Sequence, residues 1–159
     1  MNYRHSSGFT FIELLVTLAI VAVLASIAYP MAELAKQRER ERELKTALRE
    51  IRSALSAYKR AGDEGRIPRR ANESGFPRTL QELVDGVEDA KAPARNKIYF
   101  LRRIPRDPTN PDQAASAQAT WGKRSYASSP DKPAEGMDVF DVYSRTTGMG
   151  LNGVPYREW

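Results

Sequence analysis

The chain has 159 residues, a formal net charge of +5 and no cysteine. The lack of cysteine excludes disulfides, thiolate nucleophiles and thiolate metal sites. The one histidine, His5, precedes a long apolar run, so a form of the chain without its N-terminus has no Ser-His-Asp triad. The length suits one domain, or one long element with a smaller domain.

The apolar run extends from Phe9 to Met31 and contains one ionisable side chain, that of Glu13. At a rise of about 1.5 Å per residue, a helix over this run is long enough to cross a hydrocarbon core of about 30 Å. A single-pass anchor and a secretory signal peptide, with small residues at 25–28, both fit the hydropathy. Glu13 argues against both, because a carboxylate costs about 2.5–3.5 kcal/mol at mid-span and no neighbouring residue neutralises it.

The stretch "GFTFIELLVTLAIVAVLASIAYP" resembles the N-terminus of type IV pilins and of the pseudopilins of type II secretion. In that family a membrane-embedded prepilin peptidase removes a short leader that ends in glycine, and the new first residue, usually phenylalanine, is N-methylated. The resemblance implies a leader of residues 1–8, cleavage between Gly8 and Phe9, and methylation of Phe9. Glu13 then matches the glutamate at the fifth mature position, and Pro30 matches the proline at the twenty-second.

The resemblance also implies roles for Glu13 and Pro30. In filaments of this family the glutamate faces the N-terminal amine of a neighbouring subunit and fixes the register, although pairing with the amine of its own chain, or extension toward the membrane surface, are alternatives for the free subunit. The ring of Pro30 and its missing N–H weaken the preceding turn. The family helix kinks or melts locally near this position.

A second periodic segment follows, over residues 32–61. Its apolar residues are spaced alternately by four and three, which predicts one stripe of an amphipathic helix. Gly62 is a stop signal. We therefore expect one helix over 9–61, with a membrane-spanning and filament-core half (9–31) and an amphipathic half (32–61). The run "KQRERERE" invites a nucleic-acid interpretation, but alternating signs are typical of a solvated, ion-paired face. The stripe consists of Leu44, Leu48, Ile51, Leu55 and Tyr58.

The remaining residues, 62–159, are expected to form a periplasmic α+β globular domain. A short helix is predicted between Thr79, as its cap, and Gly86, as its end. Strands are predicted in "KIYFLRRIPRDP", "KRSYASS" and "MDVFDVYS". The predicted fold is α+β and pilin-like: a long N-terminal helix packed on a small antiparallel sheet of about three strands.

The order of the C-terminal pieces, with "RRIPRDP", Trp-Gly and "DVFDVYS", resembles the major, G-type pseudopilin of type II secretion. The resemblance implies a calcium ion in the loop after the last strand. That loop here is "SRTTGMGLNGVPYREW", in which the expected acidic ligands are missing. Asp138, Asp141 and Asn152 offer oxygens, but calcium requires six to eight. We therefore predict no metal site and no cofactor, with Asp138 and Asp141 solvated at a sheet edge.

The functional hypothesis is a pseudopilin, a non-enzymatic subunit of a periplasmic filament that drives protein export across the outer membrane. The resemblance implies a single-pass protein of the bacterial inner membrane with its C-terminal domain in the periplasm. Its implied partners are further copies of itself, other pseudopilins, the prepilin peptidase, an assembly platform and, indirectly, a secretion ATPase. The alternatives are a major or minor pilin of a type IV pilus, serving adhesion or motility, and a DNA-binding competence pilin, although nucleic-acid binding is not favoured.

Overall fold

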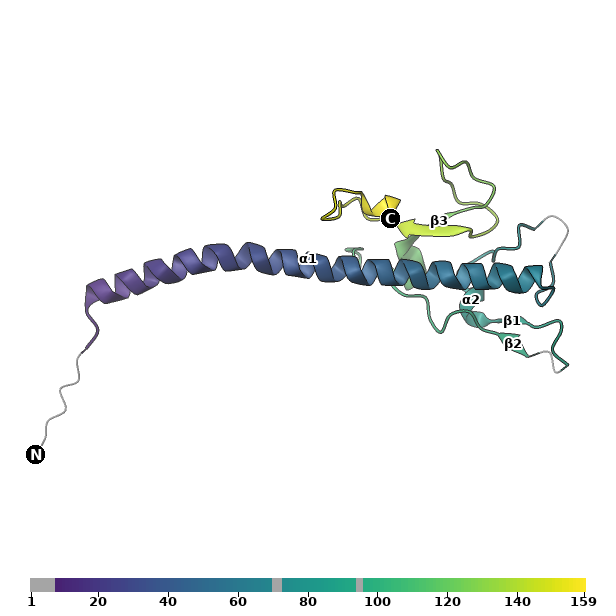
Figure 1. Ribbon diagram of the computed structural model, residues 1–159, viewed down its shortest axis with the longest axis horizontal. Coiled ribbons are helices and arrows are strands. Elements are labelled where there is room, and N and C mark those ends of the chain that lie inside the picture. The colour runs from purple at the N-terminus through teal and green to yellow at the C-terminus, as the bar shows by residue number, and fades with distance from the viewer. Residues whose placement is uncertain (1–7, 70–72, 94–95) are drawn as a thin grey trace, which may run out of the picture. The chain divides into compact units, whose positions relative to one another are not determined.

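The computed structural model describes residues 8–69, 73–93 and 96–159 (Figure 1). The chain divides into two compact units, residues 1–39 and residues 40–159. The boundary falls within one helix, α1, which extends from Phe11 to Asp63 and contains 53 residues. The first unit therefore consists of the start of α1, whereas the second contains its end and everything that follows.

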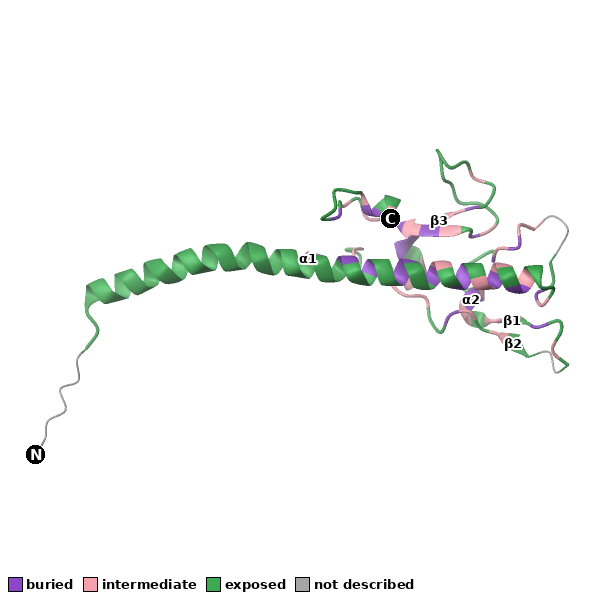
Figure 2. Ribbon diagram, viewed as in Figure 1, coloured by how far each residue is buried: buried purple, intermediate pink, exposed green. Residues whose placement is uncertain are grey.

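The second half of α1 carries the buried stripe that the sequence predicts. Ile51 and Leu44 are fully buried, and Leu48, Leu55 and Tyr58 are at most 9% exposed. Figure 2 shows buried and exposed residues alternating along this half. The spacing of four and three places these side chains on one face of an α-helix, where they pack against the loops and strands of the same unit.

The helix α2 is shorter than the sequence predicts. It spans Glu82–Asp85, and the expected cap at Thr79 is wrong: Thr79 lies in a turn, where its carbonyl accepts a hydrogen bond from the N–H of Glu82 at 3.3 Å. The predicted end is confirmed, because Gly86 takes a φ of +74° that favours glycine. Gln81 occupies the cap position and makes no capping hydrogen bond with its side chain, and its neighbour Leu80 is fully buried.

The strands form two separate antiparallel pairs, so the expected single sheet of about three strands is wrong. One pair joins β1 to β2, and the other joins β3 to β4. The second pair is a hairpin in which Trp121 faces Ser144 and Arg124 faces Asp141. The α+β class and the packing on a long helix are as predicted. The strands are β1 (Val87–Glu88), β2 (Lys97–Ile98), β3 (Trp121–Arg124) and β4 (Asp141–Ser144).

Strand β3 lies earlier than the predicted "KRSYASS" segment. It ends at Arg124 because the next N–H, that of Ser125, bonds to the carbonyl of Ala134 at 2.9 Å. Within the hairpin, Gly122 faces Tyr143, and a Cβ atom at Gly122 would lie 2.3 Å from the ring of Tyr143. This close approach requires glycine at position 122.

The core of the second unit gathers around the indole of Trp121, which is fully buried. Its Nε1 donates a hydrogen bond to the carbonyl of Pro105 at 2.8 Å, so the buried polar atom of the ring is satisfied. Leu80, Leu83 and Val142 are also fully buried and belong to the same cluster as the α1 stripe. The domain therefore closes over one face of α1.

A buried carboxylate, that of Asp107, joins the loop before β3 to the end of β4. Asp107 is fully buried. Its Oδ1 accepts hydrogen bonds from the N–H and the hydroxyl of Thr109 at 2.8 and 2.6 Å, and its Oδ2 accepts one from the hydroxyl of Ser144 at 2.6 Å. A buried carboxylate is tolerated where its oxygens are satisfied in this way.

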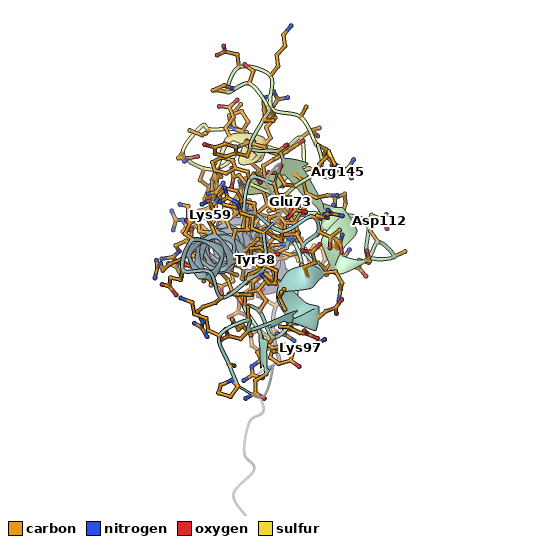
Figure 3. All side chains as sticks on the ribbon, turned by 90° about the vertical axis from the view of Figure 1, so that its right-hand side faces the viewer. Tyr58, Lys59, Glu73, Lys97, Asp112 and Arg145 are labelled. Atoms are coloured by element: carbon orange, nitrogen blue, oxygen red, sulfur yellow. The ribbon has the colours of Figure 1, made fainter. Side chains whose placement is uncertain are left out.

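Contacts within the second unit shift the pKa values of Tyr58 and Asp89 in opposite directions. Burial, with the negative charge of Glu82 beside it, raises the pKa of Tyr58 to about 12, and its hydroxyl lies 3.4 Å from Glu82 Oε2. Figure 3 shows Tyr58 on the side of α1 that faces the rest of the unit. Hydrogen bonds from Arg66, the shorter at 2.6 Å, lower the pKa of Asp89.

Candidate processing and assembly site

The start of α1 is a capping box formed by Thr10 and Glu13. The N–H and the hydroxyl of Thr10 each donate a hydrogen bond to Glu13 Oε2 at 3.1 Å, and the N–H of Glu13 donates one to Thr10 Oγ1 at 3.3 Å. The N–H groups at the start of a helix have no acceptor within the helix, and here the side chains of Thr10 and Glu13 supply acceptors for two of them. The position of Glu13 in the first turn also suits the helix dipole.

This geometry adds a residue that the interpretation of the sequence did not include. Thr10 supplies hydrogen-bond donors to the Glu13 carboxylate. The donors bring no positive charge, so Glu13 remains available to a cation. The signal for Thr10 was present, because Thr-x-x-Glu is the sequence pattern of a capping box.

The predicted cleavage junction lies immediately before this capping box. Gly8 and Phe9 are outside the helix and exposed, and Phe9 exposes 76% of its surface. A Cβ atom placed on Gly8 would meet nothing within 4 Å. The peptide bond between them therefore lies in exposed backbone that precedes the hydrogen-bonded part of α1. Residues 1–7 of the predicted leader lie outside the described residues.

The first half of α1 has an apolar surface that its own chain does not cover. Every residue from Phe11 to Met31 is exposed. An 18-residue window of this helix has a mean hydropathy of 2.6, and by length and composition the helix can cross a membrane. A continuous apolar surface of this size marks a membrane or a protein interface.

Pro30 does not interrupt the helix. The α-helical pattern continues through Pro30 to Asp63, so the local melting implied by the family resemblance is not seen in the single chain. Pro30 follows a stretch in which the hydroxyl of Ser26 bonds back to the carbonyl of Val23 at 2.7 Å. The proline still lacks its N–H, and the preceding turn has one backbone hydrogen bond fewer.

The residues available for a calcium ion do not fit one. Asp141 is bound by two arginines, since Arg52 Nε and Arg124 Nη1 lie 2.8 Å from its two oxygens. Asp138 accepts hydrogen bonds from Tyr126 N–H at 3.1 Å and from two serine hydroxyls. The expectation that both are solvated is wrong, because each is engaged by the protein. No group of three or more metal-ligating side chains occurs within the described ranges.

The N-terminus of the chain is similar to a known family motif. The model of the prokaryotic N-terminal methylation motif matches residues 3–29, which include the junction and Glu13. Together with the exposed apolar half-helix and the α+β unit, this match defines a type IV pilin-like protein.

Relatives that match over most of the chain show its family. It is 31% identical to the type II secretion system core protein G of Klebsiella pneumoniae, over 96% of this chain and 89% of that protein. It is 30% identical to the protein of the same name from Aeromonas hydrophila, over 96% and 88%. The chain belongs to the family of the type II secretion system core protein G, and is a pseudopilin. No solved structure matches it.

Proposed function

We propose that the chain is cleaved between Gly8 and Phe9 by a prepilin peptidase, N-methylated on Phe9, and assembled as a structural subunit of a periplasmic filament. The observation that carries this proposal is the contrast along α1. Residues 11–31 expose an apolar surface, whereas the later stripe is covered by the chain's own domain. We expect this pattern of exposed and covered apolar surface in a subunit that first lies in lipid and later packs against other subunits.

Cleavage creates an amine on Phe9, close to Glu13. In the filament, the carboxylate of one subunit pairs with the amine of its neighbour. The Thr10 hydrogen bonds at 3.1 Å hold the carboxylate at the helix start until this amine arrives. Removing one partner of a buried ion pair costs about 3–5 kcal/mol in general, so a misaligned neighbour is disfavoured even where the pair adds little net stability.

Before assembly, α1 anchors the subunit in the bacterial inner membrane, with residues 40–159 in the periplasm. Subunits join other copies and other pseudopilins at an inner-membrane platform powered indirectly by a secretion ATPase. Growth of the filament moves exported proteins through an outer-membrane pore. The chain acts as a structural subunit without an enzymatic activity of its own.

The decisive experiment compares Glu13→Ala with Glu33→Ala, which removes an exposed carboxylate elsewhere in the first unit. Both variants are expected to be cleaved. Glu13→Ala is expected to reduce incorporation into sheared or cross-linked filaments by about 100-fold or more, because about 3 kcal/mol corresponds to more than two decades. Normal incorporation of Glu13→Ala would remove the register role.

Deletion of the gene separates the secretion function from its alternatives. We expect exported enzymes to accumulate in the periplasm, with secretion restored by the wild-type chain and by Glu33→Ala. Loss of twitching with normal secretion would indicate a type IV pilus subunit instead. Loss of DNA uptake with normal secretion would indicate a competence pilin.

A further inference from the structure

The C-terminal segment, residues 145–159, is fastened to α1 through a buried carboxylate. Glu41 is 7% exposed. Its Oε1 accepts a hydrogen bond from the N–H of Leu151 at 2.8 Å and another from the hydroxyl of Tyr156 at 3.1 Å. One carboxylate oxygen of the helix therefore holds two points of the C-terminal segment, one on its backbone and one on a buried side chain.

A second side chain of α1, Arg52, holds the far end of the segment. Its Nη2 donates to the main-chain oxygen of Trp159 at 2.7 Å and to the carbonyl of Val142 at 3.1 Å, while its Nε bonds to Asp141 at 2.8 Å. The ammonium of Lys45 lies 4.6 Å from the centroid of the Trp159 ring, within the range of a cation–π contact. Three residues of one helix thus contact the segment along its length.

The segment is also closed by its own hydrogen bonds. The N–H of Gly150 bonds to the carbonyl of Val154 at 2.9 Å, and the N–H of Tyr156 bonds to the carbonyl of Gly148 at 3.1 Å. Gly153 has a φ of +75°, which permits the tight turn between them. The indole N–H of Trp159 bonds to the same Val154 carbonyl at 3.1 Å, so the last residue folds back on the turn.

The C-terminal segment has too few carboxylates for a calcium ion. Between Ser144 and Trp159 the one acidic residue is Glu158. The side-chain oxygen of Asn152 accepts a hydrogen bond from the N–H of Val154 at 3.1 Å. Calcium takes six to eight oxygens, several of them from carboxylates. The donor set does not match the ion that the resemblance to G-type pseudopilins implies for this loop.

We propose that Glu41 and Arg52 hold the C-terminal segment in place of a bound cation, and that folding of residues 40–159 is independent of divalent metal. The helix supplies the negative and positive groups that fasten the loop, and the loop supplies N–H, hydroxyl and carbonyl partners. The segment is therefore coupled to α1 itself.

The test measures thermal unfolding of the full chain in detergent micelles by tryptophan fluorescence, with calcium chloride or with EDTA. We expect the same midpoint in both. Glu41→Ala is expected to lower the midpoint by at least about 4 °C and to speed carboxypeptidase digestion of the segment by about tenfold, because the buried Tyr156 hydroxyl and the partly buried Leu151 N–H lose their acceptor. Glu43→Ala, at an exposed position of the same helix, is the matched control and is expected to change neither.

Glu41→Gln distinguishes a role of Glu41 as a hydrogen-bond acceptor from a role as a metal ligand. The amide oxygen still accepts both hydrogen bonds, so we expect this variant to lie closer to the wild type than Glu41→Ala, with or without calcium. If Glu41→Ala does not fold, Glu41→Gln and the calcium titration of the wild type carry the test. A midpoint of the wild type that rises by several degrees with calcium, or equal midpoints for Glu41→Ala and Glu43→Ala, would overturn the proposal.

Discussion

The two units show one helix used in two ways. In residues 40–63, α1 buries its apolar stripe against the domain that follows it in the chain. In residues 11–31 every side chain is exposed, although this half is the more apolar. Hydrophobicity alone therefore does not determine burial within a chain. The second half packs against residues of the same polypeptide, whereas the described residues of the chain leave the first half exposed, and we propose that lipid and other subunits cover it.

The carboxylates of the two units also differ in where their hydrogen-bond donors come from. In the second unit, buried carboxylates are satisfied by distant parts of the chain, as Glu41 is by Tyr156 and Asp107 is by Ser144. In the first unit, Glu13 has the local Thr10 donors. The Thr10 cap supplies hydrogen bonds to the Glu13 carboxylate but no opposite charge, as the proposed pairing with a neighbouring amine requires.

The largest difference between the halves is expected on truncation of a buried isoleucine. Ile51→Ala removes a fully buried side chain and is expected to cost about 2–5 kcal/mol of unfolding free energy. Ile20→Ala, at a position 55% exposed in the same helix, is expected to leave that free energy within about 0.5 kcal/mol. Denaturant titration of the full chain in micelles, followed by tryptophan fluorescence, measures both. Equal losses of unfolding free energy in the two variants would contradict a difference in burial between the two halves of α1.

The next effect concerns the buried carboxylate of Asp107. Asp107→Ala leaves the Thr109 and Ser144 donors without their acceptor, and we expect a loss of about 1–3 kcal/mol in the same titration. Asp131→Ala, at an exposed position, is expected to have no measurable effect. A neutral Asp107→Ala would mean that this network does not stabilise the second unit.

A smaller effect is expected at the start of α1. Thr10→Ala removes the capping hydroxyl and is expected to destabilise the first turn by about 0.5–2 kcal/mol. Hydrogen exchange at residues 11–14 in micelles should become faster, while exchange in the second unit should not change. Thr17→Ala, whose hydroxyl bonds to the carbonyl of Leu14 inside the helix, is the control. Unchanged exchange in Thr10→Ala would show that the box does not set the helix start.

The smallest effect is confined to alkaline pH. The folded chain keeps the Tyr58 proton up to a pKa of about 12, above the ordinary value of 10.0. The stability that this proton confers is complete below about pH 10 and is lost as pH rises through the folded pKa. Tyr58→Phe is therefore expected to lose less stability between about pH 10 and 12 than the wild type. Tyr126→Phe, an exposed ring, should behave as the wild type does.

The sequence predicts well what depends on short spacing. The buried stripe follows from a spacing of four and three, and the N-terminal methylation motif, which its family model matches over residues 3–29, is a local pattern. Glu41 and Thr10 were missed, although both carry a signal: Glu41 lies three residues before Leu44 and continues the stripe, and Thr10 starts a capping-box pattern. The sequence does not show which groups these two side chains contact in the folded chain.

The strands were harder to predict because they are short. Strands β1 and β2 contain two residues each, so propensity has little weight. The end of β3 depends on where the N–H of Ser125 finds its partner, which is the distant carbonyl of Ala134. We expected a single sheet from three apolar segments, whereas the structure contains two separate pairs of strands. Tertiary hydrogen bonds, rather than local preference, fix these boundaries.

We propose that the exposed half of α1 becomes the N-terminus of the mature, assembly-competent subunit once the leader is removed. Mass spectrometry of the chain, purified from cells with and without an active prepilin peptidase, tests this proposal. With the peptidase, we predict a mature protein that begins with N-methylated Phe9; without it, the residues before Phe9 are retained. Retention of those residues in cells with an active peptidase would contradict the account.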